Sequence, residues 1–369
     1  MTVDRRSLLA WLAGGTVVDK LPTASVMSGC RDRRHCRGAR AFAVNDPTSH
    51  EVQPRAAESC TIPYAPDSSV AEAFHITAAL GGGKPHRFEI DTGSVGVLVP
   101  RDVLGPAYQD FDPSKDQTFS YVSSGNSYQG QWVTLPVVMG VPESWDGSGD
   151  YPTATIAVFA VDHMDDDLSK KYTGGMFGVG FDIGDQADAG AGCNPFLNAV
   201  YRGTPLTRGY ILTQDGIVLG PTAADAAGFA TVSLQRNAKG DDWQQPMGHI
   251  DMAAPNDRDW PRLSTDLTVL MDTGVPEMLL WLTAAQRPAG WPDVVPPGAD
   301  VAVSLAADGG NAPALAYSFT TGAADQPMAP SAVNLRKGKG GLNTGRHVLA
   351  RYDYLYDADG GRIGFRARP

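Results

Sequence analysis

The sequence lacks the motifs on which several large enzyme classes depend. Only four cysteines occur in 369 residues and none forms a Cys-x-x-Cys pair, so a zinc ribbon or a thioredoxin-type site has no support. The chain has no His-Glu-x-x-His, no Gly-x-Ser-x-Gly and no Walker phosphate loop, which removes the usual signals of metalloproteases, serine hydrolases and P-loop enzymes. We therefore expect neither a metal nor a cofactor.

Long hydrophobic runs are also missing. Residues 4–18 place a twin arginine before a short apolar segment, which resembles a bacterial twin-arginine export signal and is too short to span a bilayer. We expect an export signal over residues 1–29, a linker or pro-segment over 30–61, and a periplasmic or extracellular protein without a membrane span. A disordered terminus is the alternative, and Met27–Cys30 leaves open a lipid anchor at Cys30.

Positive charge is scarce outside the first forty residues. Residues 1–40 hold eight Lys and Arg against three acids, a net charge of +5. Because the whole chain has a net charge of −11, residues 41–369 carry −16. Such an acidic body would repel phosphates, which argues against nucleic acid as a partner. The basic stretch of residues 31–40 is either a solvated linker or a pro-segment that covers an acidic cleft.

The four cysteines set no disulfide pattern by themselves. Export would permit disulfide bonds. Cys30, Cys36, Cys60 and Cys193 allow three pairings, and the sequence does not choose among them.

Glycine and proline, by contrast, are abundant, with 42 and 27 copies. Short apolar segments between them predict an all-β protein with many turns and few, short helices. We expect strands at 74–80, 88–90, 131–139, 153–161, 209–212, 216–220, 230–234, 348–356 and 362–365. Short helices are expected near 195–201 and 283–286.

Two Asp-Thr-Gly segments follow apolar runs and dominate the pattern. The first is Asp91-Thr92-Gly93-Ser94 after Phe88-Glu89-Ile90, and the second is Asp272-Thr273-Gly274 after Val269-Leu270-Met271, 181 residues later. One such tripeptide is a common turn. Two copies, each at the tip of an apolar strand, indicate an internal duplication and a paired-acid site.

Further elements in the same order make the chain resemble the pepsin-like aspartic proteases over most of residues 62–369. Met176-Phe177-Gly178 matches the apolar-apolar-Gly element behind the first aspartate, and residues 345–357 match the closing segment of that family. The resemblance implies a bilobal, all-β acid protease fold with two pseudo-twofold related lobes and a few short helices. The lobes would be an N-terminal lobe over 62–225 with Asp91 and a C-terminal lobe over 226–369 with Asp272.

The same resemblance implies the activity and its residues. Asp91 and Asp272 would share one proton and activate a water that attacks a peptide carbonyl, without cofactor or covalent intermediate. Gly93 and Gly274 would let the backbone approach the carboxyl groups, and the Thr92 and Thr273 hydroxyls would tie the two loops together. The expected partner is a polypeptide substrate, and the protein is expected to be a monomer.

Three departures from the family affect this expectation. Val275 stands where the family usually has a Ser or Thr that supports the second aspartate, as Ser94 supports the first, and Pro276 stiffens the same loop. Leu98 replaces the usual Trp beneath the flap tyrosine. The tyrosine position falls on Ser123, and Tyr121 or Tyr128 could substitute if the flap hairpin carries an insertion or deletion.

The third departure is Asn343-Thr344-Gly345, which replaces two apolar residues before glycine and has no functional interpretation from sequence. Together the departures leave an alternative open. The chain could be a catalytically weak or inactive pepsin-like protein that binds a partner through its cleft or loops.

Overall fold

The computed structural model describes residues 58–108, 110–120, 127–161, 175–182, 191–240, 242–310 and 312–368. All of them belong to one compact unit. The all-β prediction is confirmed, because the longest helical segment among these residues is the five-residue 3-10 helix η5. The short 3-10 helices are η1 (Arg101–Val103), η2 (Pro106–Tyr108), η3 (Pro113–Lys115), η4 (Ala191–Cys193) and η5 (Arg346–Ala350).

A nine-stranded sheet carries the first aspartate. Its strands, in spatial order, are β10 (Thr204–Pro205), β9 (Val200–Tyr201), β7 (Thr153–Val161), β4 (Val95–Pro100), β8 (Met176–Val179), β3 (His86–Asp91), β2 (His75–Leu80), β6 (Ser127–Met139) and β5 (Gln117–Ser120). Strands β3 and β4 are buried over most of their length, which is why the sequence around Asp91 reads as two apolar runs.

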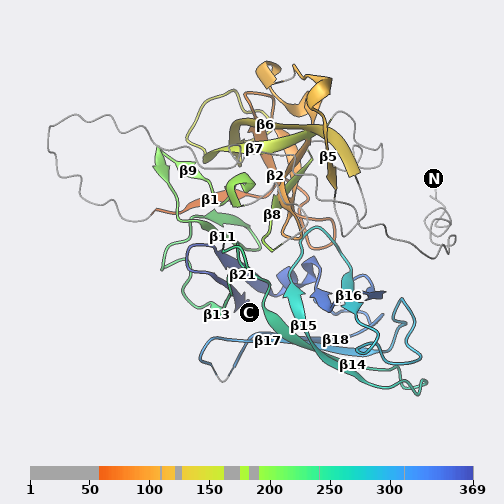
Figure 1. Cartoon of the computed structure of the whole chain (residues 1–369). Helices are drawn as coiled ribbons and strands as arrows, with labels where there is room; N and C mark the ends of the chain where they lie inside the picture. The colour runs from red at the N-terminus through yellow and green to blue at the C-terminus, as the bar shows by residue number, and fades with distance from the viewer. Residues whose placement is uncertain are drawn as a thin grey trace. The chain divides into compact units, whose positions relative to one another are not determined.

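A seven-stranded sheet is built from strands that come before and after Asp272 in the sequence. Figure 1 shows its strands β14, β15, β17 and β18 side by side. Its order is β18 (Pro313–Thr320), β17 (Asp300–Ala306), β14 (Met247–Ala253), β15 (Leu263–Leu270), β20 (Gly341–Asn343), β16 (Met278–Leu282) and β19 (Val333–Lys337). Buried and solvent-facing residues alternate along β14 and β17, as expected for a sheet with one face on the core.

The centres of these two sheets repeat one arrangement. The order β7-β4-β8-β3-β2 matches β19-β16-β20-β15-β14 strand for strand. The directions match as well: β3–β8 and β15–β20 are parallel, and β8–β4 and β20–β16 are antiparallel. The outer pairs β4–β7 and β16–β19 are parallel, and β2–β3 and β14–β15 antiparallel. The duplication inferred from the two Asp-Thr-Gly segments is therefore present in the strand topology.

A third sheet of six strands combines residues from both expected lobes. Its order is β1 (Cys60–Pro63), β12 (Gly216–Leu219), β11 (Gly209–Leu212), β21 (Tyr352–Asp357), β22 (Arg362–Ala367) and β13 (Ala230–Ser233). The strands predicted at 209–212, 216–220 and 362–365 are confirmed, and they form the hairpins β11–β12 and β21–β22.

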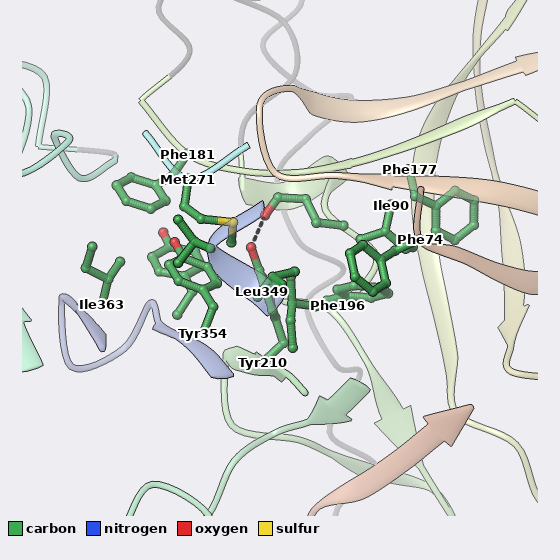
Figure 2. Packing of buried hydrophobic residues seen from close by; sticks show 14 of the residues in the cluster. Phe74, Ile90, Phe177, Phe181, Phe196, Tyr210, Met271, Leu349, Tyr354 and Ile363 are labelled. Atoms are coloured by element: carbon green, nitrogen blue, oxygen red, sulfur yellow. Dashed lines mark hydrogen bonds between the residues drawn. The ribbon is translucent and has the colours of Figure 1, made fainter. Parts of the chain in front are cut away.

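The core is continuous beneath both aspartates. Ile90 and Met271, the residues directly before Asp91 and Asp272, belong to the same buried cluster as Phe177 and Leu349. Figure 2 shows these four side chains in one packed group. Because protein interiors are close-packed, this cluster restrains the position of both strand tips.

Three helix or strand predictions were wrong. Residues 195–198 form a turn and residues 200–201 form β9. The Asn194 side chain accepts the N–H groups of Phe196 and Leu197, as a helix cap would, but the chain leaves after one turn and pairs with β10. Residues 284–286 form a turn closed by hydrogen bonds between Thr283 and Gln286. The strand expected from 348 starts only at Tyr352, after η5.

Other expectations fall at or beyond the edge of the described residues. The expected export signal and residues 30–57 of the expected linker lie outside them, and β1 begins at Cys60 within that linker. Cys60 and Cys193 are buried thiols that form no disulfide with each other. No helix among the described residues is long and apolar enough to cross a membrane.

Candidate active site

The two aspartates occupy equivalent places at the tips of the repeated strands. Asp91 ends β3, and Asp272 follows β15 by two residues. Only 7% of each residue is exposed. Burial of two carboxyl groups is costly unless hydrogen bonds or a shared proton compensate it, so the partners of these groups decide what the site can do.

The two threonines link the repeats through a reciprocal set of hydrogen bonds. The Thr92 hydroxyl donates to the carbonyl of Met271 (2.5 Å) and accepts the N–H of Thr273 (3.0 Å). The Thr273 hydroxyl donates to the carbonyl of Ile90 (2.5 Å) and accepts the N–H of Thr92 (3.0 Å). Each threonine therefore holds the backbone of the opposite motif, as the sequence predicted.

The two glycines cross in the same way. A Cβ atom on Gly93 would lie 2.2 Å from Oδ2 of Asp272, and one on Gly274 would lie 2.7 Å from Oδ1 of Asp91. Each glycine thus leaves room for the carboxyl group of the other motif. Its own N–H donates to Oδ1 of its own motif's aspartate, at 2.7 Å in both cases.

The two carboxyl groups act on each other electrostatically, since the charge of Asp91 raises the pKa of Asp272. Burial raises the pKa of both. The pKa of Asp272 lies well above its usual value because of burial and the charge of Asp91, whereas the Ser94 hydroxyl opposes the rise in the pKa of Asp91. Two like charges this close do not form together cheaply, so the pair keeps one proton over a range of acidic pH.

The donors around the two carboxyl groups differ. Ser94 supports Asp91, and its Oγ also lies 3.6 Å from the sulfur of Met176. Val275 offers Asp272 no hydroxyl, but Nδ2 of Asn343 lies 2.5 Å from Oδ2 of Asp272. Sequence reasoning identified Asn343 as a departure from the family and missed its role as a donor.

A buried glutamate adds negative charge on the side of the first aspartate. Glu89 lies two residues before Asp91 on β3, is 1% exposed, and raises the pKa of Asp91 through its charge. The site is therefore electrostatically unequal on its two sides. Asp91 has a hydroxyl donor and a nearby acid, and Asp272 has an amide donor.

The flap candidates are only partly within the described residues. Tyr121 and Ser123 lie outside them. Tyr128 lies on β6 opposite Phe119 of β5 and is 6% exposed. Tyr128 and Leu98 belong to the same small apolar cluster. The leucine that replaces the expected tryptophan thus packs in the region that also buries this tyrosine.

One other set of side chains has the order of a catalytic triad. Oγ of Ser264 lies 3.2 Å from Nε2 of His249, whose Nδ1 lies 2.7 Å from Oδ1 of Asp266. These residues stand on the exposed side of the β14–β15 pair, whose strands are paired along this stretch. An acyl-transfer site also needs preorganised donors for an oxyanion. The backbone N–H groups of paired strands already take part in the ladder, so this set of side chains has no clear source of such donors.

Within the described residues, no group of three or more His, Cys, Asp or Glu side chains could hold a metal ion. A scan against protein-family models and a search of curated proteins each found no match to this chain.

Proposed function

We propose that this chain is a pepsin-like aspartic endopeptidase with a bilobal fold, and that Asp91 and Asp272 hydrolyse peptide bonds in it. The observation that carries the proposal is the reciprocity of the two motifs. Each threonine binds the other repeat, each glycine makes room for the other carboxyl group, and the charge of one buried carboxyl group raises the pKa of the other. Two buried acids held this close are expensive for a purely structural turn.

The proposed reaction uses one ionised and one protonated carboxyl group. Asp91 takes a proton from a water molecule as the water oxygen bonds to the peptide carbonyl carbon. Asp272 donates its proton to the carbonyl oxygen, which gives a tetrahedral intermediate. Asp91 then passes its proton to the leaving nitrogen as the C–N bond breaks, and Asp272 takes a proton back from a hydroxyl of the intermediate as the carboxylic acid product forms. Water supplies both product hydrogens, so the reaction needs no further reactant.

The direct test replaces either acid. Asp91→Asn and Asp272→Asn are each expected to abolish cleavage of a broad peptide library at acidic pH while the protein remains folded. Asp215→Asn is the matched control, because Asp215 is exposed in the β11–β12 turn. A statine-type transition-state mimic should inhibit the wild type. Undiminished cleavage by either aspartate variant would refute the proposal.

A non-catalytic binding protein is the second candidate, and Val275 and Leu98 are the observations that favour it. The same library digest separates the two, since a folded wild type that cleaves nothing from acid to neutral pH would be a binder. We also propose that the protein is exported and acts on polypeptides as a monomer. The mass of the mature N-terminus, produced in a bacterium with twin-arginine export, tests the processing of residues 1–29 and any lipid on Cys30.

A further inference from the structure

Met176 and Asn343 occupy equivalent positions in the two repeats. Met176 pairs with Glu89 in the parallel β8–β3 ladder, and Asn343 pairs with Leu270 in the parallel β20–β15 ladder. Both partners lie two residues before the aspartate of their repeat. The structure therefore permits a position-by-position comparison of the two carboxyl environments.

The hydrogen-bond donor has changed position between the repeats. In the first, the position after Gly93 is polar (Ser94) and the β8 position is apolar (Met176). The Ser94 hydroxyl lies 3.6 Å from the Met176 sulfur and lowers the pKa of Asp91. In the second, the position after Gly274 is apolar (Val275) and the β20 position is the polar Asn343. Each repeat keeps one side-chain donor for its carboxyl group.

The Asn343 amide is held in the orientation that this role requires. Its Oδ1 accepts the N–H of Gly345 at 2.8 Å, so its NH2 group faces Asp272, where Nδ2 lies 2.5 Å from Oδ2. Asn343 is 3% exposed, so water does not compete for the amide. A donor fixed by a second hydrogen bond is preorganised for the carboxyl group.

We propose that Asn343 is the positioning residue for Asp272 and replaces the hydroxyl that Val275 lacks. This inference rests on the proposed function for its effect on catalysis. Asn343 orients the Asp272 carboxyl group and stabilises its ionised form. The charge of Asp91 opposes the ionisation of this carboxyl group, and the charge of Glu89 in turn raises the pKa of Asp91.

The test exchanges the donor back to the arrangement of the first repeat. Asn343→Met removes the donor and installs the residue found at position 176. Asn343→Met combined with Val275→Ser reproduces the Met176–Ser94 arrangement around Asp272. Asn334→Met is the matched control, because Asn334 lies on β19, two strands from β20 in the same sheet.

Asn343→Met is expected to lower kcat/KM about 10- to 100-fold, the range for losing a hydrogen bond to a charged group, because Asp272 becomes charged as it gives up its proton. The loss should appear mainly in kcat, because the amide touches the acid rather than the substrate. The basic limb of the pH profile should move to higher pH, since Asp272 loses a donor that favours its ionised form. The double variant should recover both the rate and the wild-type pH limb.

A carboxyl 13C NMR titration of Asp272 gives a readout that does not depend on turnover. Its pKa should rise in Asn343→Met and return toward the wild-type value in the double variant, with no change in Asn334→Met. A wild type without peptidase activity would refute the proposed function alone, and this titration would then decide the inference.

Unchanged pKa and pH profile in folded Asn343→Met would overturn the proposal. Should the single variant not fold, the double variant decides: a folded double variant with a displaced pH limb or Asp272 pKa also overturns it, whereas wild-type values support it.

Discussion

The threonine cross-link makes a quantitative prediction about stability. Thr92→Val and Thr273→Val each keep the shape of the side chain and remove only the hydroxyl. Each substitution leaves two backbone groups of the opposite motif, one carbonyl and one N–H, without their hydroxyl partner. Thr92 is 2% exposed and Thr273 is 0% exposed, so water cannot replace the lost hydrogen bonds.

The magnitude follows from the two groups left without a partner. A buried polar group that loses its hydrogen bond costs about 1–3 kcal/mol, so two of them predict a loss of about 2–6 kcal/mol per variant. The two variants should lose similar amounts, because the distances on the two sides are the same, 2.5 Å and 3.0 Å. Equal losses in the two variants are the more specific expectation, because they follow only from the equivalence of the two repeats.

Urea unfolding, followed by tryptophan fluorescence and far-UV circular dichroism, measures the change. Thr155→Val serves as the control, because Thr155 is exposed on β7 and a surface substitution changes stability by about 0.5 kcal/mol or less. A loss no larger than that of the control in either threonine variant would refute the reasoning. A large loss in only one of them would refute the equivalence of the two repeats.

Three further predictions concern pH and close packing. The raised pKa of Asp272 means that stability is lost as pH rises from the ordinary aspartate range through the folded-state value, so Asp272→Asn should flatten that decline in urea midpoints measured between pH 4 and 8. Burial lowers the pKa of His347 to about 3, so stability is lost as pH falls from about 6.5 toward 3; His347→Gln, which can keep the contact to Tyr317, should unfold at lower pH in acid titrations followed by circular dichroism. Gly93→Ala should abolish peptide cleavage because its Cβ would overlap the Asp272 carboxyl group, whereas Gly310→Ala, with 3.4 Å to its nearest neighbour, should cleave at the wild-type rate.

The sequence was informative where the signal is local. Gly- and Pro-bounded apolar segments predicted most strands, since strand formation follows alternation and turn residues over a few positions. The two Asp-Thr-Gly segments indicated the candidate site because the three residues of each are adjacent in sequence, although the threonine and the glycine act on the other repeat. The helix prediction at 195–201 failed because Asn194 caps the first turn as it would cap a helix, and the pairing of β9 with β10 then ends that turn.

The missing part of the site depended on contacts between distant positions. Asn343 lies 71 residues from Asp272 and reaches it only because β20 pairs with β15. Two signals were available in the sequence. Asn343 is polar at a position where an apolar residue was expected, and Val275 has no hydroxyl at a position where one was expected. Linking the two observations required the register of the strands, which no local pattern supplies.

The crossing of each glycine beneath the other motif's carboxyl group has a consequence for how such a chain can diverge. Gly93 is constrained by the size of Asp272, and Gly274 by that of Asp91. Substitutions in the outer hairpins of one repeat need no matching change in the other. A larger residue at either glycine would require a change in the opposite Asp-Thr-Gly segment. A gene fragment that encodes one repeat would therefore inherit a glycine and a threonine whose partners are encoded in the other.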